Sequence, residues 1–190
     1  MLRMEAWSSS FTTRLAGAQI GSTYNQYAES ELRRERLRAY LDARTDAPVL
    51  LVGEAAGYRG ARVSGVPFTS ERQLSGTGPA EATATIVHRV LARLGIEDDV
   101  LLWNVVPTHP GTATSNRRPT RAEIAAGLQL LHELSTGRRP VAVGRLAATV
   151  LGNAPYVRHP SHGGAGEFAR GLARALDQPL FATIPPRPSS

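Results

Sequence analysis

Residues 48–55 read Pro-Val-Leu-Leu-Val-Gly-Glu-Ala, and residues 100–107 read Val-Leu-Leu-Trp-Asn-Val-Val-Pro. Both stretches are apolar along nearly their whole length, whereas a strand with one exposed face alternates between apolar and polar residues. Shorter stretches of the same kind occupy residues 140–145 and 155–159. Each stretch leads into a turn rich in glycine, proline or polar residues. The pattern predicts strands that are buried on both faces.

Helical patterns lie between these stretches. Residues 79–94 carry apolar side chains at helical spacing, begin with a proline and stop before a glycine. In residues 120–135, Thr120 and Glu123 form a capping box at the start of another helical pattern. Further helices are expected at residues 22–44, 145–151 and 166–176.

Strands that alternate with helices predict a parallel sheet with helices on both sides. We therefore expect an α/β fold, a three-layer α/β/α sandwich that forms a single domain over residues 1–190. Residues 1–20 and 184–190 show no periodicity and are expected to be surface arms. In such sheets, ligands bind beyond the carboxyl ends of the strands. The loops after each strand are therefore the places to look for chemistry.

The composition excludes several kinds of chemistry. The chain has 42% hydrophobic and 20% charged residues, as ordinary globular domains do, and it has no cysteine. Disulfides, iron-sulfur clusters and thiol nucleophiles are therefore excluded. All 22 basic residues are arginine, so a lysine Schiff base and a P-loop are excluded too. Without a long apolar run or a signal-peptide pattern, we expect a cytoplasmic protein without membrane contact.

The positive charge is concentrated in residues 100–174, and the rest of the chain is balanced. Such an excess in one part of a chain indicates an anionic partner, most often nucleic acid, although a solvated basic surface gives the same pattern. Arg117 and Arg118 lie in a loop without a neighbouring acid in the sequence. Together with Arg158, they are the candidates for phosphate contacts.

Three side chains in or after the first two predicted strands are candidates for a ligand site. Glu54 follows a strand between small residues and is suited to act as a general base, or else to cap a helix or pair with an arginine. Phe68 is either a platform for a planar ligand or a core anchor. Asn104 lies inside an apolar strand, where its amide either binds a base edge or ties loops together.

The loop at residues 158–164 contains two histidines, a serine and two adjacent glycines. Pro160 restricts His159 to an extended conformation, and a fixed imidazole can stabilise a developing anion. A metal site at His159, His162 and His109 would lack a carboxylate at ligand spacing, so we expect no metal. A serine hydrolase built on Ser161 would lack the nucleophile-elbow motif.

The ordered set of motifs resembles the uracil-DNA glycosylase superfamily. Gly-Glu-x-x-Gly at residues 53–57, Pro-Phe at 67–68, Asn104 and His-Pro-Ser at 159–161 occur in that family's order and spacing. The resemblance covers roughly Val49 to Gly164. It implies a central four-stranded parallel sheet, DNA as the partner, no cofactor, and hydrolysis of the N-glycosidic bond of a flipped base.

The resemblance also implies a role for each matching residue. Phe68 would stack on the base, Asn104 would bind its polar edge, and His159 would donate to the carbonyl that gains charge. Glu54 would position or activate water. The remaining positions fall into two groups: base-binding residues Gly53, Ala55 and Gly57, and the phosphate clamp of Ser161, His162, Gly163 and Gly164.

Three positions depart from the family's better-known branches. Ala56 replaces a proline of the branch that carries an iron-sulfur cluster. Ala55 stands where another branch has its catalytic aspartate, and Gly57 stands where that branch has a tyrosine that excludes thymine. We therefore expect a roomier pocket that accepts 5-substituted uracils.

The His-Gly-Gly segment at residues 162–164 offers no large apolar wedge to fill a vacated base stack. Single-stranded or mismatched DNA is therefore the expected substrate, because flipping costs least there. The protein is expected to act as a monomeric, monofunctional glycosylase that removes uracil or a related base during base excision repair. The alternatives are a non-catalytic nucleic-acid or nucleotide binder and a small-molecule nucleoside hydrolase.

Overall fold

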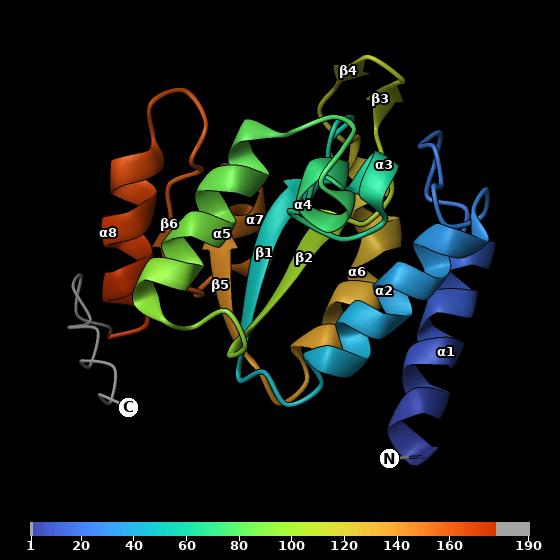
Figure 1. Cartoon of the computed structure of the whole chain (residues 1–190), viewed down its shortest axis with the longest axis horizontal. Coiled ribbons are helices and arrows are strands. Elements are labelled where there is room, and N and C mark those ends of the chain that lie inside the picture. Colours follow the sequence, from blue (N-terminus) through green and yellow to red (C-terminus); the bar gives the residue numbers. More distant parts are fainter. Residues whose placement is uncertain (1, 178–190) are drawn as a thin grey trace, which may run out of the picture.

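A computed structural model describes residues 2–177, and Figure 1 shows a parallel sheet between two layers of helices. The sheet has the order β2-β1-β5-β6, and every neighbouring pair is parallel. Its strands are β1 (Val49–Ala55), β2 (Val100–Val106), β5 (Arg139–Val143) and β6 (Tyr156–Val157). Two short strands, β3 (Gly111–Thr112) and β4 (Ser115–Asn116), form a separate antiparallel pair. The expected four-stranded parallel sheet is confirmed.

The side chains of β1 show why both faces of the sheet are covered. Leu50 and Val52 belong to one hydrophobic cluster, and Val49 and Leu51 belong to the other. The first cluster packs under α1 (Leu2–Gly17), α2 (Glu31–Ala43), α6 (Arg121–Ser135) and α7 (Arg145–Leu151). The second packs under α5 (Ala82–Leu94) and α8 (Ala165–Ala175). Successive side chains of a strand point to opposite faces, so a strand with no polar face needs two helical layers.

The helix boundaries follow capping chemistry. Thr120 caps α6, and the side chain of Glu123 accepts a hydrogen bond from the Thr120 backbone N–H, as the capping box predicts. The helix expected at residues 22–44 begins only at Glu31, because Ser30 is its N-cap and accepts a hydrogen bond from the Arg33 backbone N–H. Two short helices, α3 (Ala61–Ser64) and α4 (Glu71–Ser75), lie in the long connection between β1 and α5.

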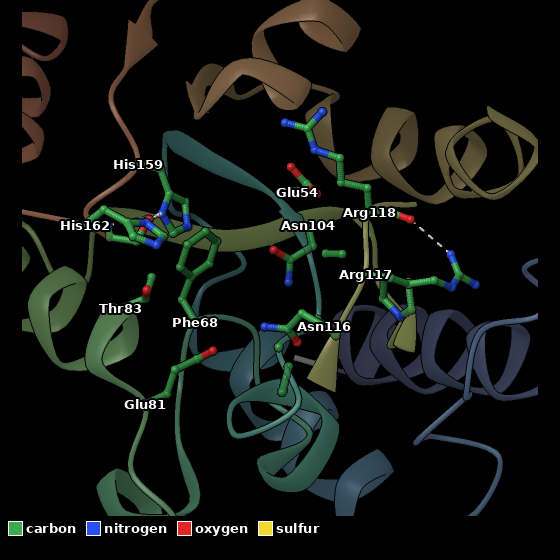
Figure 2. Close-up of a pocket in the computed structure, with 16 residues that line it drawn as sticks. Glu54, Phe68, Glu81, Thr83, Asn104, Asn116, Arg117, Arg118, His159 and His162 are labelled. Carbon is green, nitrogen blue, oxygen red and sulfur yellow. Dashed lines mark hydrogen bonds between the residues drawn. The ribbon is translucent and has the colours of Figure 1, made fainter. Parts of the chain in front are cut away.

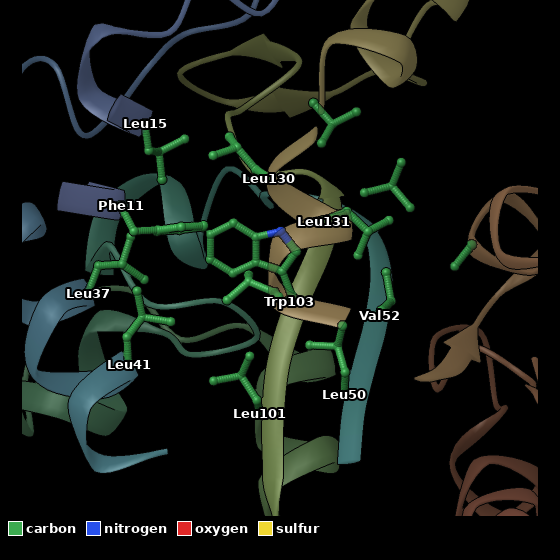
Figure 3. Packing of buried hydrophobic residues seen from close by; sticks show 14 of the residues in the cluster. Phe11, Leu15, Leu37, Leu41, Leu50, Val52, Leu101, Trp103, Leu130 and Leu131 are labelled. Atoms are coloured by element: carbon green, nitrogen blue, oxygen red, sulfur yellow. The ribbon is translucent and has the colours of Figure 1, made fainter. Parts of the chain in front are cut away.

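The expectation that residues 1–20 form a surface arm is wrong. Phe11 and Leu15 of α1 are fully buried against Trp103 of β2. The rings of Phe11 and Trp103 meet edge to face with centroids 5.5 Å apart, and Figure 3 shows them inside the same apolar cluster. The amino-terminal helix is therefore part of the core. The arm expected at residues 184–190 lies outside the described residues.

Within residues 2–177, no helix combines the length and apolar character that crossing a membrane requires.

Candidate active site

A cavity of about 480 Å³ opens at the carboxyl ends of β1 and β2, next to the loop that follows β6. Its walls include Glu54 at the end of β1, Phe68 between α3 and α4, Asn104 of β2 and His159 after β6. Figure 2 shows these four side chains around one space. The structure thus brings together residues that separate motifs predicted. Ala55 and Gly57 also line this cavity.

Gly53 lies behind the cavity and allows two wall residues to approach the strand. A Cβ atom at this position would overlap the ring of Phe68 and lie 2.9 Å from Oδ1 of Asn104. Both approaches are too close for a side chain. Glycine is therefore required here for the ring and the amide to occupy their positions.

Asn104 is buried, with 4% of its surface exposed, and its amide makes no hydrogen bond to another described residue. Enclosing an amide without a partner costs free energy, so native proteins rarely leave one unpaired. The amide faces the cavity, as Figure 2 shows. It is free to donate to and accept from a bound ligand, and it does not tie loops together.

Phe68 has a positive φ of 52°, which is uncommon for a residue other than glycine. The surrounding segment holds this strained backbone in place. The Ser64 hydroxyl donates to the Thr69 carbonyl at 2.7 Å, and the Thr69 hydroxyl lies 3.1 Å from Nε2 of His88. Phe68 itself belongs to the core cluster beneath α5. It is therefore both a core anchor and a wall of the cavity.

His159 is held in one tautomer. The backbone N–H of Ser161 donates to its Nδ1 at 3.2 Å, and the Ser161 hydroxyl lies 2.8 Å from the same atom. Because Nδ1 accepts a hydrogen bond, a neutral ring carries its proton on Nε2. Burial, with a smaller contribution from nearby His162, lowers the pKa of His159 and favours this neutral form. The ring can thus donate one N–H bond to a ligand.

Glu54 is half-buried, and its carboxylate makes no hydrogen bond to any residue that the structure describes. Burial raises its pKa, and the positive charge of Arg118 acts in the opposite direction. A carboxylate that is partly desolvated but still ionised is a better proton acceptor than one in water. Within residues 2–177, the Glu54 carboxylate neither caps a helix nor forms an ion pair.

Sequence reasoning missed Glu81, a second carboxyl group of the cavity wall. Burial raises the pKa of its carboxyl group, which has no hydrogen bond or ion pair within the described part of the chain. Its carboxyl oxygens lie where Cβ atoms of Gly57 and Gly60 would be. The space left by the missing side chain at Gly57 is therefore taken up by Glu81. The sequence signal that could have indicated Glu81 is its position as an acid directly before a helix.

Two of the three predicted phosphate-binding arginines are engaged elsewhere. Arg117 pairs with both carboxylate oxygens of Glu123, whose side chain is 1% exposed. This ion pair lowers the pKa of Glu123 to about 2. Arg158 pairs with Glu167 on the surface. No acid stands beside Arg117 in the sequence, but its partner Glu123 lies in the first turn of the next helix. Among residues 2–177, the Arg118 guanidinium has no ion pair.

The remaining residues of the His-Pro-Ser loop lie partly outside the cavity. Ser161 and His162 line it, but Gly163 and Gly164 do not. The Ser161 hydroxyl lies between the two imidazoles, 2.8 Å from Nδ1 of His159 and 3.0 Å from Nδ1 of His162. Ser161 therefore orients His159, a role that differs from the expected phosphate clamp.

His109 is not placed to bind a metal with the other histidines. It is fully buried, and its two ring nitrogens lie 2.7 Å and 2.8 Å from the carbonyl oxygens of Ala56 and Thr112. Across residues 2–177, no group of three or more histidine, aspartate or glutamate side chains is arranged to hold a metal ion.

The sheet order and the cavity at its carboxyl edge define an α/β/α domain with an enzyme-type pocket. A solved structure with this fold is the crystal structure of wild-type SMUG2 from Pedobacter heparinus. It matches with a TM-score of 0.66 and 13% identity, covering 90% of this chain and 97% of that one. The model of the uracil DNA glycosylase superfamily matches residues 41–190, and the chain belongs to this superfamily. A search of curated proteins found no significant match.

Proposed function

We propose that the protein is a monofunctional DNA glycosylase that hydrolyses the N-glycosidic bond of uracil or a related base flipped out of DNA. One observation carries this proposal: Glu54, Phe68, Asn104 and His159 come from four separate segments and line one cavity. Membership of the uracil DNA glycosylase superfamily supports it. The alternative without catalysis, a nucleic-acid or nucleotide binder, uses the same cavity but requires neither Glu54 nor His159.

In this proposal, Phe68 and Asn104 bind the base. The ring of Phe68 forms a flat apolar wall, which suits stacking on a pyrimidine. The free amide of Asn104 donates to one carbonyl oxygen of uracil and accepts from its ring N–H. A base that lacks this donor and acceptor edge leaves the buried amide unpaired, and such a mismatch discriminates strongly between substrates.

His159 stabilises the departing base. As the bond between C1′ of deoxyribose and N1 of uracil breaks, its electron pair moves onto the base, and negative charge grows on the neighbouring carbonyl oxygen. The Nε2–H group of neutral His159 donates a hydrogen bond to that oxygen. A single preoriented donor of this kind contributes about 3–4 kcal/mol in other enzymes.

Glu54 acts as the general base that activates the attacking water. The water oxygen bonds to C1′ and its proton passes to Glu54. Glu54 then releases this proton to solvent, and the departed uracil anion takes one up, so the hydrolysis needs no cofactor. Burial raises the pKa of Glu54 and makes it a stronger base than an exposed glutamate, and the positive charge of Arg118 opposes this rise. Because the chain has no lysine, no Schiff base with the sugar is expected, and the DNA strand remains intact after base release.

Single-stranded or mismatched DNA is the substrate that the site favours. Flipping a base out of a regular duplex costs a few kcal/mol. The loop at residues 162–164 has no bulky apolar side chain to fill the gap that the flipped base leaves in the stack. Arg118 is the arginine of the cavity wall that has no ion pair within residues 2–177.

The acceptance of 5-substituted uracils depends on the position of Glu81, which fills the space next to Gly57. All four functional side chains come from one chain, so a monomer suffices.

The test is release of uracil from a uracil-containing oligonucleotide, followed by alkali to cleave the abasic strand. Breakage only after alkali treatment is expected, with single strands cleaved faster than matched duplexes. Glu54→Gln should lose most activity and retain DNA affinity. Binding without breakage would favour the non-catalytic alternative. Activity on free nucleosides with little dependence on salt would favour a nucleoside hydrolase.

A further inference from the structure

A second cavity, of about 450 Å³, lies at the carboxyl ends of β5 and β6. It shares Arg118, His159, Ser161 and His162 with the first cavity, so the two spaces meet at the His-Pro-Ser loop. Its other walls include Arg145 and Tyr156, to which the proposed reaction assigns no role. An occupant of this cavity would be next to whatever fills the first.

Tyr156 is unusual in its exposure. It lies on β6, the edge strand of the sheet, and 52% of its surface is exposed, whereas the next residue, Val157, is buried in the core. Its hydroxyl group makes no hydrogen bond to another described residue. An exposed aromatic ring at the rim of a basic cavity is the arrangement on which proteins stack nucleobases of single strands.

The charge of this cavity is positive. Arg118, Arg145 and Arg158 all contribute to its wall, and only Arg158 has an acidic partner, Glu167, within residues 2–177. Two guanidinium groups therefore remain for an anion. Guanidinium binds phosphate oxygens well because its N–H donors match their geometry.

We propose that the second cavity binds the nucleotide adjacent to the flipped one, with its base stacked on Tyr156 and its phosphate held by Arg145 and Arg118. This inference rests on the proposed function, because it assigns a neighbour to the base that the first cavity holds. The shared wall at the His-Pro-Ser loop matches a ligand whose two units are joined by one phosphodiester. An unpaired neighbour base can stack on a protein ring, so the cavity favours single strands.

The decisive experiment uses three single-stranded oligonucleotides with one uracil each. One is intact, one has an abasic residue on the 5′ side of the uracil, and one has it on the 3′ side. For the unmodified protein, one of the two abasic strands should raise KM for uracil release roughly tenfold, with kcat unchanged, because a stacked base is lost. If neither abasic strand changes KM, the proposal is overturned.

Variants of Tyr156 locate the effect. Tyr156→Ala should raise KM for the intact strand to the value that the abasic strand gives with the unmodified protein, and it should no longer distinguish the two strands. Tyr156→Phe, which keeps the ring, should behave like the unmodified protein. If the ratio of KM between the abasic and intact strands is the same for Tyr156→Ala as for the unmodified protein, the base stacks elsewhere and the proposal is wrong.

The phosphate contact has its own measurement. Arg145→Ala should weaken binding and reduce the slope of log Kd against log salt concentration by about 0.7, the value for one phosphate contact on a single strand. Arg93→Ala is the matched control, because it removes the same charge from the last turn of α5. An unchanged slope for Arg145→Ala would contradict the contact.

Failure of the proposed function and failure of this inference give different results. If the unmodified protein releases no uracil, the proposed function is wrong. Fluorescence anisotropy with the same three oligonucleotides still tests the second cavity, because it measures affinity without turnover. A Tyr156-dependent preference for the intact strand would then support a single-strand binding site, and equal affinities would overturn it.

Discussion

The backbone N–H of Ser161 donates a hydrogen bond to Nδ1 of His159 at 3.2 Å, and this bond decides which ring nitrogen can donate. With Nδ1 accepting, the proton of the neutral ring is on Nε2, and the ring borders the cavity. The loop backbone therefore prepares His159 as a hydrogen-bond donor before any substrate arrives.

Replacing His159 tests this role directly. His159→Ala should lower kcat for uracil release by about 10²–10³-fold, the loss seen when one preoriented donor is removed from an active site. Affinity for a uracil-containing strand should change little, because the donor acts mainly on the charge of the transition state. Single-turnover kinetics and anisotropy measure the two quantities. A kcat within threefold of the unmodified protein would remove His159 from the mechanism.

Arg118 should control the acidic limb of the pH profile. The positive charge of Arg118 lowers the pKa of Glu54 and opposes the effect of burial. Because the ionised carboxylate is the active form, kcat/KM falls as the pH drops through the pKa of Glu54. Arg118→Ala removes the opposing charge, so this limb should move to higher pH. Arg93→Ala should leave the limb in place, and a shift to lower pH for Arg118→Ala would contradict the argument.

Glu81 should reduce stability at neutral pH. Its pKa in the folded protein is raised by burial, so the folded state favours the protonated form and loses stability as the pH rises through that pKa. Glu81→Gln should therefore raise Tm at pH 7 by roughly 2–4 °C, the shift that about 1 kcal/mol produces in a chain of this size. The difference should disappear near pH 4, and calorimetry at both values checks it.

Gly53→Ala should damage the site through two side chains at once. The new methyl group would overlap the Phe68 ring and lie 2.9 Å from Oδ1 of Asn104. Such overpacking typically costs about 1–3 kcal/mol of stability, and the displaced ring and amide should raise KM at least tenfold. Gly17→Ala is the matched control, because a Cβ atom there meets no other atom within 4 Å. Urea unfolding and steady-state kinetics distinguish the two variants.

Arg117 and Arg118 are adjacent in sequence but should behave differently. Arg117→Ala leaves the enclosed carboxylate of Glu123 without its ion pair and should destabilise the fold by about 1–3 kcal/mol, with no change in the salt dependence of DNA binding. Arg118→Ala should leave the stability of the fold unchanged. It should reduce the slope of log Kd against log salt concentration by about 0.7 on single strands. Equal effects of the two variants on this slope would indicate that Arg117 also contacts phosphate.

Local patterns were sufficient for much of the fold. The apolar runs at residues 49–52 and 100–103 predicted strands buried on both faces, and the two clusters packed on opposite sides of the sheet confirm this. The pair Thr120 and Glu123 predicted the start of α6, because a capping box requires only residues three positions apart. In contrast, Phe11 and Leu15 lie among serines and threonines, and their burial depends on Trp103, far away in the chain.

Periodicity and chain direction were enough to predict the alternation of strands and helices and the sheet edge at which Glu54, Asn104 and His159 meet. It took the folded chain to show that Arg117 pairs with Glu123, that Ser161 orients His159, and that Glu81 faces the cavity. Each of these depends on where a loop places a side chain. A pattern of residue types contains no information about a distance between loops.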